Sequence, residues 1–167
     1  FEDGFHYHFR HSPDEHVLVF GDKQQAFTSI VLPTSYVHGG GMVAQQAAIN
    51  RFDLQFQVQT NRTFARDYDF AKASRTLSAD SQADHKERAL EHYIYPGRFA
   101  EKAQGERQGL RVLERHQTGY RQASGSSDQP NLRSGHFLSM TEHPRPAWNT
   151  QWLLTDIHHE GKQPQVL

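Results

Sequence analysis

Residues 93–99 read Tyr-Ile-Tyr-Pro-Gly-Arg-Phe, and this segment is the most informative one in the chain. The aromatic residues that lead into it predict a strand over residues 90–95, because aromatic side chains fit the pleated surface of a sheet. Pro96 and Gly97 then end the strand. Pro fixes its φ and Gly tolerates a positive φ, so we expect a type II turn here.

Residues 100–117 follow this turn and carry the one helical pattern in the chain. Gly105 and Gly109 each weaken such a helix by about 1 kcal/mol relative to Ala, and Gly119 stands where a C-cap glycine is common. The apolar stripe is narrow, which predicts a helix laid on a sheet rather than one buried all round. The stripe consists of Ala103, Leu110, Val112 and Leu113.

The segment 51–60 has the clearest period in the chain. Its residues alternate strictly between apolar and polar, which predicts a strand with one dry and one wet face. The predicted dry face holds Phe52, Leu54, Phe56 and Val58. The wet face is rich in glutamine and could line a lumen, contact a neighbouring subunit or simply face solvent. Its glutamines are Gln55, Gln57 and Gln59.

Further strands are expected on both sides of this segment. Residues 5–9 and 16–20 are separated by Ser-Pro-Asp and predict a β-hairpin. The second run, His-Val-Leu-Val-Phe, is continuously apolar after its first residue and predicts a strand covered on both faces. Residues 33–48, with a glycine triplet, and residues 78–88 are expected to be loops. The remaining expected strands cover residues 66–70, 118–127, 137–140 and 152–157.

These elements add up to a mainly β (α+β) fold with one helix packed on a sheet. The chain has 167 residues, 35% hydrophobic content and a mean hydropathy of -0.82. Such low apolar content predicts a thin core or buried surface shared with a partner. The net charge of -1 argues against a general nucleic-acid partner. No apolar run is long enough to predict an integral membrane segment.

Catalytic signatures are not found. Cysteine is absent, no Gly-x-Ser-x-Gly segment occurs, and no His-Glu-x-x-His helix accompanies the twelve histidines. His6 and His8 are spaced to share a strand face, and His136 and His143 are further candidates for a metal-dependent hydrolase. Asp67 and Glu91 could serve as paired carboxylates in a glycan hydrolase. We expect instead no catalytic residues, no metal and no cofactor.

Four motifs follow one another along the chain, namely the hairpin of residues 5–22, the pentad 66–70, the segment 95–99 with the helix after it, and the block 132–161. In this order and at this spacing, they resemble the VgrG spike protein of the type VI secretion system. They resemble the region of VgrG that is similar to the hub of a contractile phage tail. The chain departs from the family pattern at Ile94, where Asp is frequent, at Ser134, where Pro is common, and at Trp148, where a small aliphatic residue is usual. The signature residues are Asp67, Tyr68, Asp69, Phe70, Tyr93, Tyr95, Pro96, Gly97, Phe99, Gly135, Phe137, His143, Pro144, Asn149, Leu154, Thr155, His158 and Gly161.

The resemblance implies a fragment of a trimeric, non-enzymatic hub that sits on a hexameric tube protein and delivers effector proteins. Residues 1–22 would be a hairpin from the middle of the hub region. Residues 23–161 would be its second, tube-like barrel domain, and residues 162–167 a linker toward a following OB-type barrel. Such a protein would be assembled in the bacterial cytoplasm and then secreted or delivered into a target cell.

Three alternatives remain open at this point. A late control protein, the baseplate hub of a contractile phage tail, shares the same expected fold. A peptidoglycan or metal-dependent hydrolase would need a cleft that brings His, Glu or Asp side chains together. A carbohydrate-binding β-module would use exposed Trp and Tyr side chains.

Overall fold

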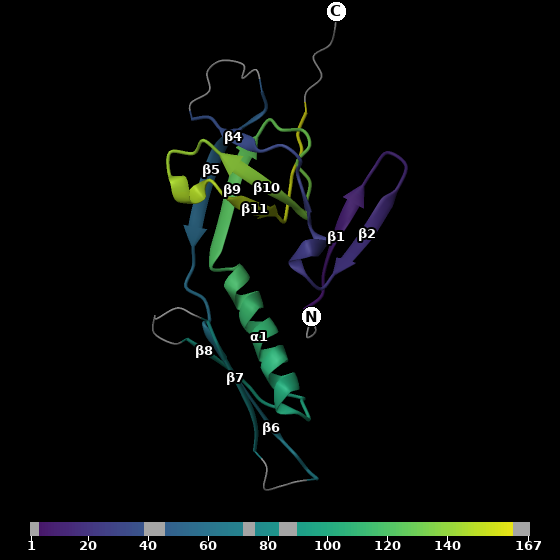
Figure 1. Ribbon diagram of the computed structural model, residues 1–167, viewed down its shortest axis with the longest axis vertical. Helices are drawn as coiled ribbons and strands as arrows, with labels where there is room; N and C mark the ends of the chain where they lie inside the picture. The colour runs from purple at the N-terminus through teal and green to yellow at the C-terminus, as the bar shows by residue number, and fades with distance from the viewer. Residues whose placement is uncertain (1–3, 39–45, 72–75, 84–89, 162–167) are drawn as a thin grey trace, which may run out of the picture. The chain divides into compact units, whose positions relative to one another are not determined.

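The computed structural model describes residues 4–38, 46–71, 76–83 and 90–161, and Figure 1 labels their elements. The chain divides into two units, one made of residues 1–4 and 53–124 and the other of residues 5–52 and 125–167. It passes from one unit to the other within strand β5 (Ala48–Phe56) and again within strand β9 (Arg121–Ser127). Within the described ranges, no helix is both long and apolar enough to cross a membrane.

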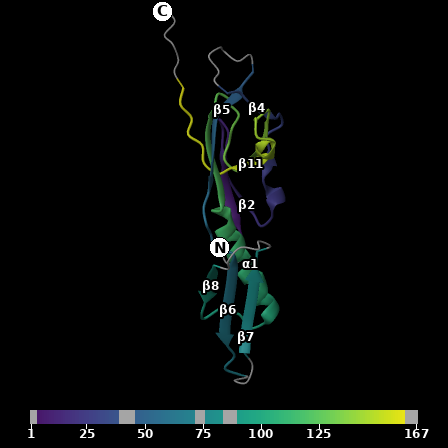
Figure 2. The same ribbon diagram turned by 90° about the vertical axis from the view of Figure 1, so that its left-hand side faces the viewer.

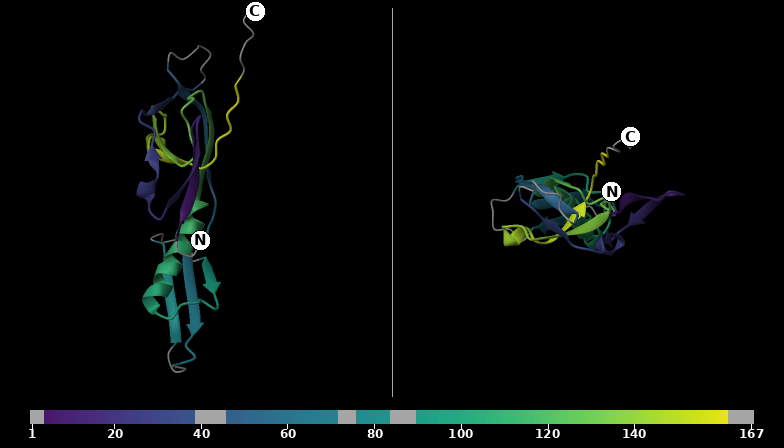
Figure 3. Two further views of the ribbon diagram at one scale, coloured as in Figure 1. Left: turned by 90° about the vertical axis from the view of Figure 1, so that its right-hand side faces the viewer. Right: turned by 90° about the horizontal axis from the view of Figure 1, so that it is seen from above.

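The unit of residues 53–124 is a three-stranded sheet with a helix on one face. The sheet order is β7-β6-β8, with β7 antiparallel and β8 parallel to the central strand. Helix α1 (Lys102–Thr118) lies along β6 and β7, as Figures 2 and 3 show. The strands are β6 (Arg62–Tyr68), β7 (Thr76–Gln82) and β8 (Glu91–Ile94).

The predicted helix and the strand expected over residues 90–95 are therefore confirmed. The strand expected over residues 66–70 is confirmed as far as Tyr68, but it begins earlier, at Arg62, and residues 69–70 lie beyond its end. The loop expected over residues 78–88 is wrong in its first part, because β7 runs to Gln82. Residues 84–88 lie outside the described residues. Gly119 is the C-cap of α1 as expected, with a φ of -80°.

The helix is buried through only part of the predicted stripe and through two glycines outside it. Ala103 and Leu110 are exposed, whereas Gly105, Gly109 and Leu113 are buried. The glycines allow the helix backbone to approach the sheet closely. The hydroxyl of Thr63 donates a hydrogen bond of 2.9 Å to the backbone carbonyl of Gly109, for example. The core of this unit is small and consists of Ala65, Leu77, Ala79 and Phe99, with Ile94 packed against it.

The other unit contains a two-stranded hairpin and a mixed sheet. The hairpin pairs β1 (His6–His11) with β2 (His16–Gly21) in antiparallel fashion, as predicted. In the mixed sheet, β10 pairs with β11 antiparallel and with β3 and β4 parallel, and the order continues through β5 to β9. The remaining elements are η1 (Gln24–Ala26), β3 (Thr28–Ser29), β4 (Thr34–Tyr36), β10 (His136–Thr141), η2 (Pro146–Trp148) and β11 (Gln151–Leu154).

The core of this second unit is formed by residues of the mixed sheet. Its buried members are Ile49, Leu138 and Met140, and aromatic side chains pack around them. Thr34 is buried and belongs to a strand, so the loop expected over residues 33–48 is wrong at both of its ends. The glycine triplet of that range lies outside the described residues.

Two predictions about strand faces are also wrong. Leu18 and Phe20 are exposed, so β2 is covered on one face only. The alternating segment 51–60 is a strand only as far as Phe56, and Val58 beyond it is 82% exposed. The mainly β fold with one helix on a sheet is confirmed, and closure of a barrel stays a prediction.

Candidate functional site

Two of the predicted signature motifs meet at the end of the helix-on-sheet unit. The carboxylate of Asp67 accepts a hydrogen bond of 2.7 Å from the N–H of Tyr68 and another of 3.2 Å from the N–H of Phe99. The N–H of Gly97 donates to the carbonyl of Arg66 at 2.8 Å. The pentad 66–70 and the loop 95–99 are thus joined by side-chain and backbone hydrogen bonds, a contact that sequence spacing does not show.

The turn at Pro96 differs from the predicted one. The Tyr95–Pro96 peptide bond is cis, and the positive φ of 56° lies at Arg98, not at Gly97. The type II turn is therefore wrong, since it requires a positive φ at the glycine. Gly97 is needed because of space: an added Cβ would lie 2.8 Å from Cδ1 of Phe99. The Phe99 ring is only 4% exposed, so it cannot move away.

Aromatic signature residues of this unit lie on the face of the sheet opposite the helix. Tyr68 and Tyr93 are exposed, and the ring of Tyr93 stacks on Phe64 with centroids 6.0 Å apart. Tyr95 and Phe70, which follow the strands, are exposed as well. Among the described residues, α1 covers one face of this sheet, and these aromatic side chains lie outside its core.

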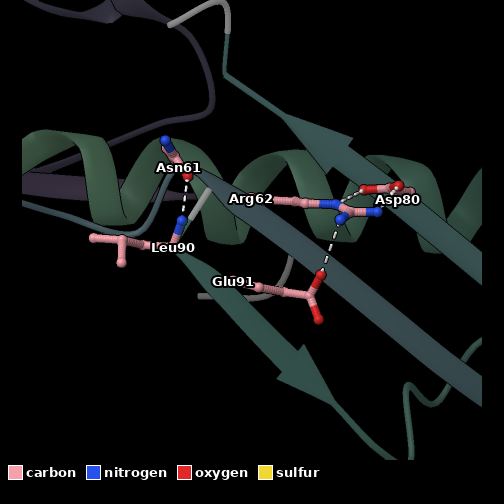
Figure 4. Close-up of polar contacts among 5 residues, drawn as sticks. All are labelled: Asn61, Arg62, Asp80, Leu90 and Glu91. Atoms are coloured by element: carbon pink, nitrogen blue, oxygen red, sulfur yellow. Dashed lines mark hydrogen bonds and ion pairs between the residues drawn. The ribbon is translucent and has the colours of Figure 1, made fainter. Parts of the chain in front are cut away.

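An ion-pair network that sequence reasoning missed joins all three strands on the same face (Figure 4). Nε and Nη2 of Arg62 donate to the two carboxylate oxygens of Asp80 at 3.0 and 2.7 Å, and Nη1 lies 3.2 Å from Glu91. The hydrogen bond and charge of Arg62 lower the pKa of Asp80. The same interaction raises the pKa of Arg62. Only the strand register brings these residues together, so the linear sequence carries no signal for them.

Asn61 fixes the start of β8 beside this network. Its side-chain oxygen accepts a hydrogen bond of 2.7 Å from the N–H of Leu90, and its own N–H donates to the Leu90 carbonyl at 3.1 Å. Asn61 is buried, so these bonds satisfy groups that water does not reach. Asn61 was likewise not identified from the sequence.

The predicted glutamine face is not one continuous strand face. Gln55 is exposed within β5, but Gln57 and Gln59 follow the end of that strand. The N–H of Gln57 donates to the carbonyl of Tyr120 at 3.0 Å, and Gln59 is half-buried. Whether Gln55, Gln57 and Gln59 contact a lumen or a subunit stays a prediction.

A second group of signature residues closes the loop between β10 and β11. The side-chain oxygen of Asn149 accepts from the N–H of His143 at 2.8 Å, and its amide nitrogen donates to the His143 carbonyl at 3.0 Å. Nδ1 of His143 accepts a hydrogen bond of 3.0 Å from the N–H of Arg145. In a neutral His143 ring the proton is therefore on Nε2. The His143 ring also packs on Tyr36 and Trp148, with centroids 4.4 and 4.6 Å apart.

The other signature residues of this region divide into two groups. Gly135 has a φ of 72° and its N–H donates to the Leu154 carbonyl at 2.8 Å, which pins the start of β10 to β11. Phe137 packs edge-on against Phe27. The second group is exposed. Next to one of its members, His158, Nε2 of His159 donates a hydrogen bond of 3.1 Å to the Leu132 carbonyl. The exposed signature residues are Pro144, Thr155, His158 and Gly161.

The histidines do not converge on a metal site in the described part of the chain, where no group of three or more His, Cys, Asp or Glu side chains could hold an ion. His6 and His8 do share one face of β1, as predicted. A pair that the sequence did not suggest is His92 and His116, whose ring nitrogens lie 2.9 Å apart. Burial lowers the pKa of His116, and the charges of His92 and Arg115 lower it further.

The chain matches, over residues 1–165, the family described as "Phage tail baseplate hub (GPD)". This match covers nearly the whole chain. The chain therefore belongs to the phage tail baseplate hub family.

Two of the similar proteins are named as spike proteins of the type VI secretion system. The chain is 51% identical to the type VI secretion system spike protein VgrG4b of Pseudomonas aeruginosa and 46% identical to VgrG5 of the same organism. It is 28% identical to a Vibrio cholerae protein named "Actin cross-linking toxin VgrG1". Each match covers 99% of this chain, but only 21%, 21% and 15% of the respective relative. The chain thus spans about a fifth of the length of its first two relatives.

Proposed function

We propose that this chain is the hub part of a type VI secretion spike protein. In this role it is a structural, non-enzymatic piece of a homotrimer that sits on a hexameric tube protein and delivers effector proteins. The match to the baseplate hub family over residues 1–165 carries the proposal. The spike-protein names of relatives that are 51% and 46% identical support the secretion role.

The contacts of the signature residues fit a structural role. Asp67 and Asn149 bind backbone groups of their own chain, and Gly97 makes room for a core ring. A catalytic set would instead direct side chains toward a common point where a reacting atom could sit. Among the described signature residues, Asp67 and Asn149 close loops, and Phe99 completes a small core.

The finer assignment is part of the same proposal. Residues 23–161 form the second, tube-like hub domain, residues 1–22 contribute a hairpin, and residues 162–167 lead toward a following OB-type barrel. Gln55, which is exposed on β5, belongs to the surface that faces the tube or a neighbouring subunit. The protein is assembled in the bacterial cytoplasm and then leaves the cell or enters a target cell.

Solution mass tests the proposal. Light scattering over a concentration series would be measured on this 19.2 kDa chain and on a version extended at its C-terminus with the sequence that follows in its parent protein. We expect a trimer in at least the extended version. A strict monomer in both would remove the assembly claim while leaving family membership intact.

A second candidate is the baseplate hub of a contractile phage tail, which the name of the family favours. The two roles predict different carriers in culture medium. A spike hub should disappear from the medium when the secretion tube protein is deleted and should not sediment with phage tails. A phage hub should sediment with tail particles whether or not the secretion tube is present.

A further inference from the structure

The β1–β2 hairpin presents histidines, rather than only hydrocarbon side chains, to the rest of its unit. His6 and His8 lie on the half-buried face of β1, whereas Tyr7 and Phe9 lie on the exposed face. The His6 ring stacks on Phe27 with centroids 4.1 Å apart and an interplanar angle of 23°. The His8 ring is 5.7 Å from the same phenyl ring. These contacts hold β1 against the segment that follows the hairpin.

A third histidine comes from the mixed sheet. His136 at the start of β10 lies edge-on to His8, with ring centroids 6.3 Å apart. Its Nδ1 donates to the Ser134 carbonyl at 3.0 Å. Between the two histidines, Gly135 leaves room for the His8 ring, because an added Cβ would overlap it. The hairpin therefore contacts β10 through imidazole rings in close packing.

Two ring nitrogens of this cluster are buried and have no hydrogen-bond partner, namely Nε2 of His6 and Nδ1 of His8. A neutral imidazole can leave an acceptor nitrogen unpartnered, but a protonated ring has two N–H donors that both need acceptors. A buried, unpaired charge costs far more than a buried neutral group. The cluster thus tolerates neutral rings and opposes charged ones.

The charged groups that face His8 act in the same direction. Burial lowers the pKa of His8, and the positive charges of His136, His6 and Arg10 lower it further. In the described part of the chain, no carboxylate makes an ion pair with any of the three rings to offset this effect. A histidine whose pKa is lowered in the folded state makes its full contribution to the free energy of unfolding at pH values above its unfolded pKa of about 6.5. That contribution is lost as the pH falls toward the folded value.

We propose that the packed rings of His6, His8 and His136 form an acid-sensitive clasp, which holds the β1–β2 hairpin on β10 while His8 is neutral and releases it when His8 is protonated. The released element would carry its exposed apolar face with it. A metal-bound version of the cluster is not supported, because the described residues contain no group of three ligands that could hold an ion.

Hydrogen exchange of individual amides, measured by NMR on the whole chain at about pH 7.5 and pH 5, tests the clasp. Rates are corrected for the intrinsic pH dependence of exchange. We expect the protection of the β1–β2 amides to fall selectively at the lower pH, because a histidine with a lowered folded pKa opposes protonation in the folded state. The protection of the β10–β11 amides should change little. Equal loss in both elements would overturn the proposal.

Two variants separate the clasp from other titrating groups. His8→Asn keeps a polar group at Nδ1 but cannot be protonated, and it should remove most of the selective loss. His16→Asn is the matched control, because it removes another hairpin histidine, the one whose Nδ1 lies 2.6 Å from that of His11. The selective loss should persist in this control. Loss that vanishes in His16→Asn and persists in His8→Asn would place the switch at the hairpin turn and overturn the clasp.

The imidazole titrations of the unsubstituted chain give a readout that does not depend on how a variant folds. His8 should titrate below the ordinary histidine pKa of about 6.5. The midpoint of the hairpin's loss of protection should coincide with the His8 titration. A His8 signal that titrates at or above the ordinary value would contradict the proposal.

Discussion

At the scale of single residues, Asn149 closes the β10–β11 loop with one side chain. Its two hydrogen bonds to the backbone of His143 are 2.8 and 3.0 Å long. Asn149→Ala removes both, and we expect a loss of about 1 to 2 kcal/mol in the free energy of unfolding because water can replace part of each exposed bond. Urea denaturation measures this loss. His158→Ala, at an exposed site, should stay within about 0.5 kcal/mol, and an equal loss there would refute the clamp.

Gly105 is another residue whose substitution has a definite sign. Alanine is the better helix former by about 1 kcal/mol, so propensity alone predicts a gain in stability. The added Cβ would lie 2.7 to 2.9 Å from the Phe99 ring, however, and that ring is buried. Overpacking of this kind costs about 1 to 3 kcal/mol, so Gly105→Ala should lower the thermal midpoint.

Arg107→Ala, at an exposed position of the same helix, is the control for Gly105→Ala and should be nearly neutral. A rise in the midpoint of Gly105→Ala would mean that the helix and the Phe99 ring are further apart than the structure has them. Such a result would also support the expectation from the sequence that the glycines of α1 only weaken the helix.

At the scale of elements, the Arg62 network ties β7, β6 and β8 together. Asp80→Asn should cost at most about 1 kcal/mol near pH 7, because the pair is partly exposed and screened by solvent. The pKa of Asp80 is lowered in the folded state, so its contribution is present above the unfolded value and is lost as the pH falls through the folded one. In urea denaturation the difference in stability between the two proteins should therefore shrink steadily as the pH falls below the unfolded pKa of Asp80. A difference that does not shrink with falling pH would exclude the ion pair as its source.

How far the sequence predicts these elements depends on what covers them. The hairpin, β8 and α1 were predicted because aromatic or charged residues mark their pattern. Strand β7 was missed because its inward face, after Leu77, reads Ala79 and Ser81, which are small residues with little hydrophobic contrast. They are small because a glycine face of α1 packs on them, and this contact depends on tertiary structure. The same fact explains the low apolar content of the chain, since this unit has a thin core.

The candidate site was predicted as a set of separate motifs rather than as contacts. Asp67 and Phe99 were both identified, yet their hydrogen bond depends on the parallel pairing of β6 with β8. Arg62 and Asp80 were not identified, because antiparallel pairing of β6 and β7 places them together from 18 positions apart. The local pattern of apolar and polar residues predicts where strands lie. The register between strands determines which side chains meet, and the local pattern does not contain it.

At the scale of the whole molecule, the chain has two cores that share no residue. One contains Phe99 and the other contains Met140, each buried within its own unit. Truncating a buried aromatic or methionine side chain to alanine costs about 2 to 5 kcal/mol. Phe99→Ala should therefore lower the hydrogen-exchange protection of α1 and β6 first, and Met140→Ala that of β10 and β11.

The pattern of loss tells whether the two units unfold independently. The chain runs continuously through β5 and β9 between the units, so each of these strands contributes residues to both. If the units unfold separately, each variant should spare the amides of the other unit, apart from those in β5 and β9. If each variant instead lowers protection uniformly over the described residues, the two cores form one cooperative unit. In that case the small core around Phe99 would depend on the other unit for its stability. The low apolar content of the chain would then be a property of the whole fold rather than of one unit.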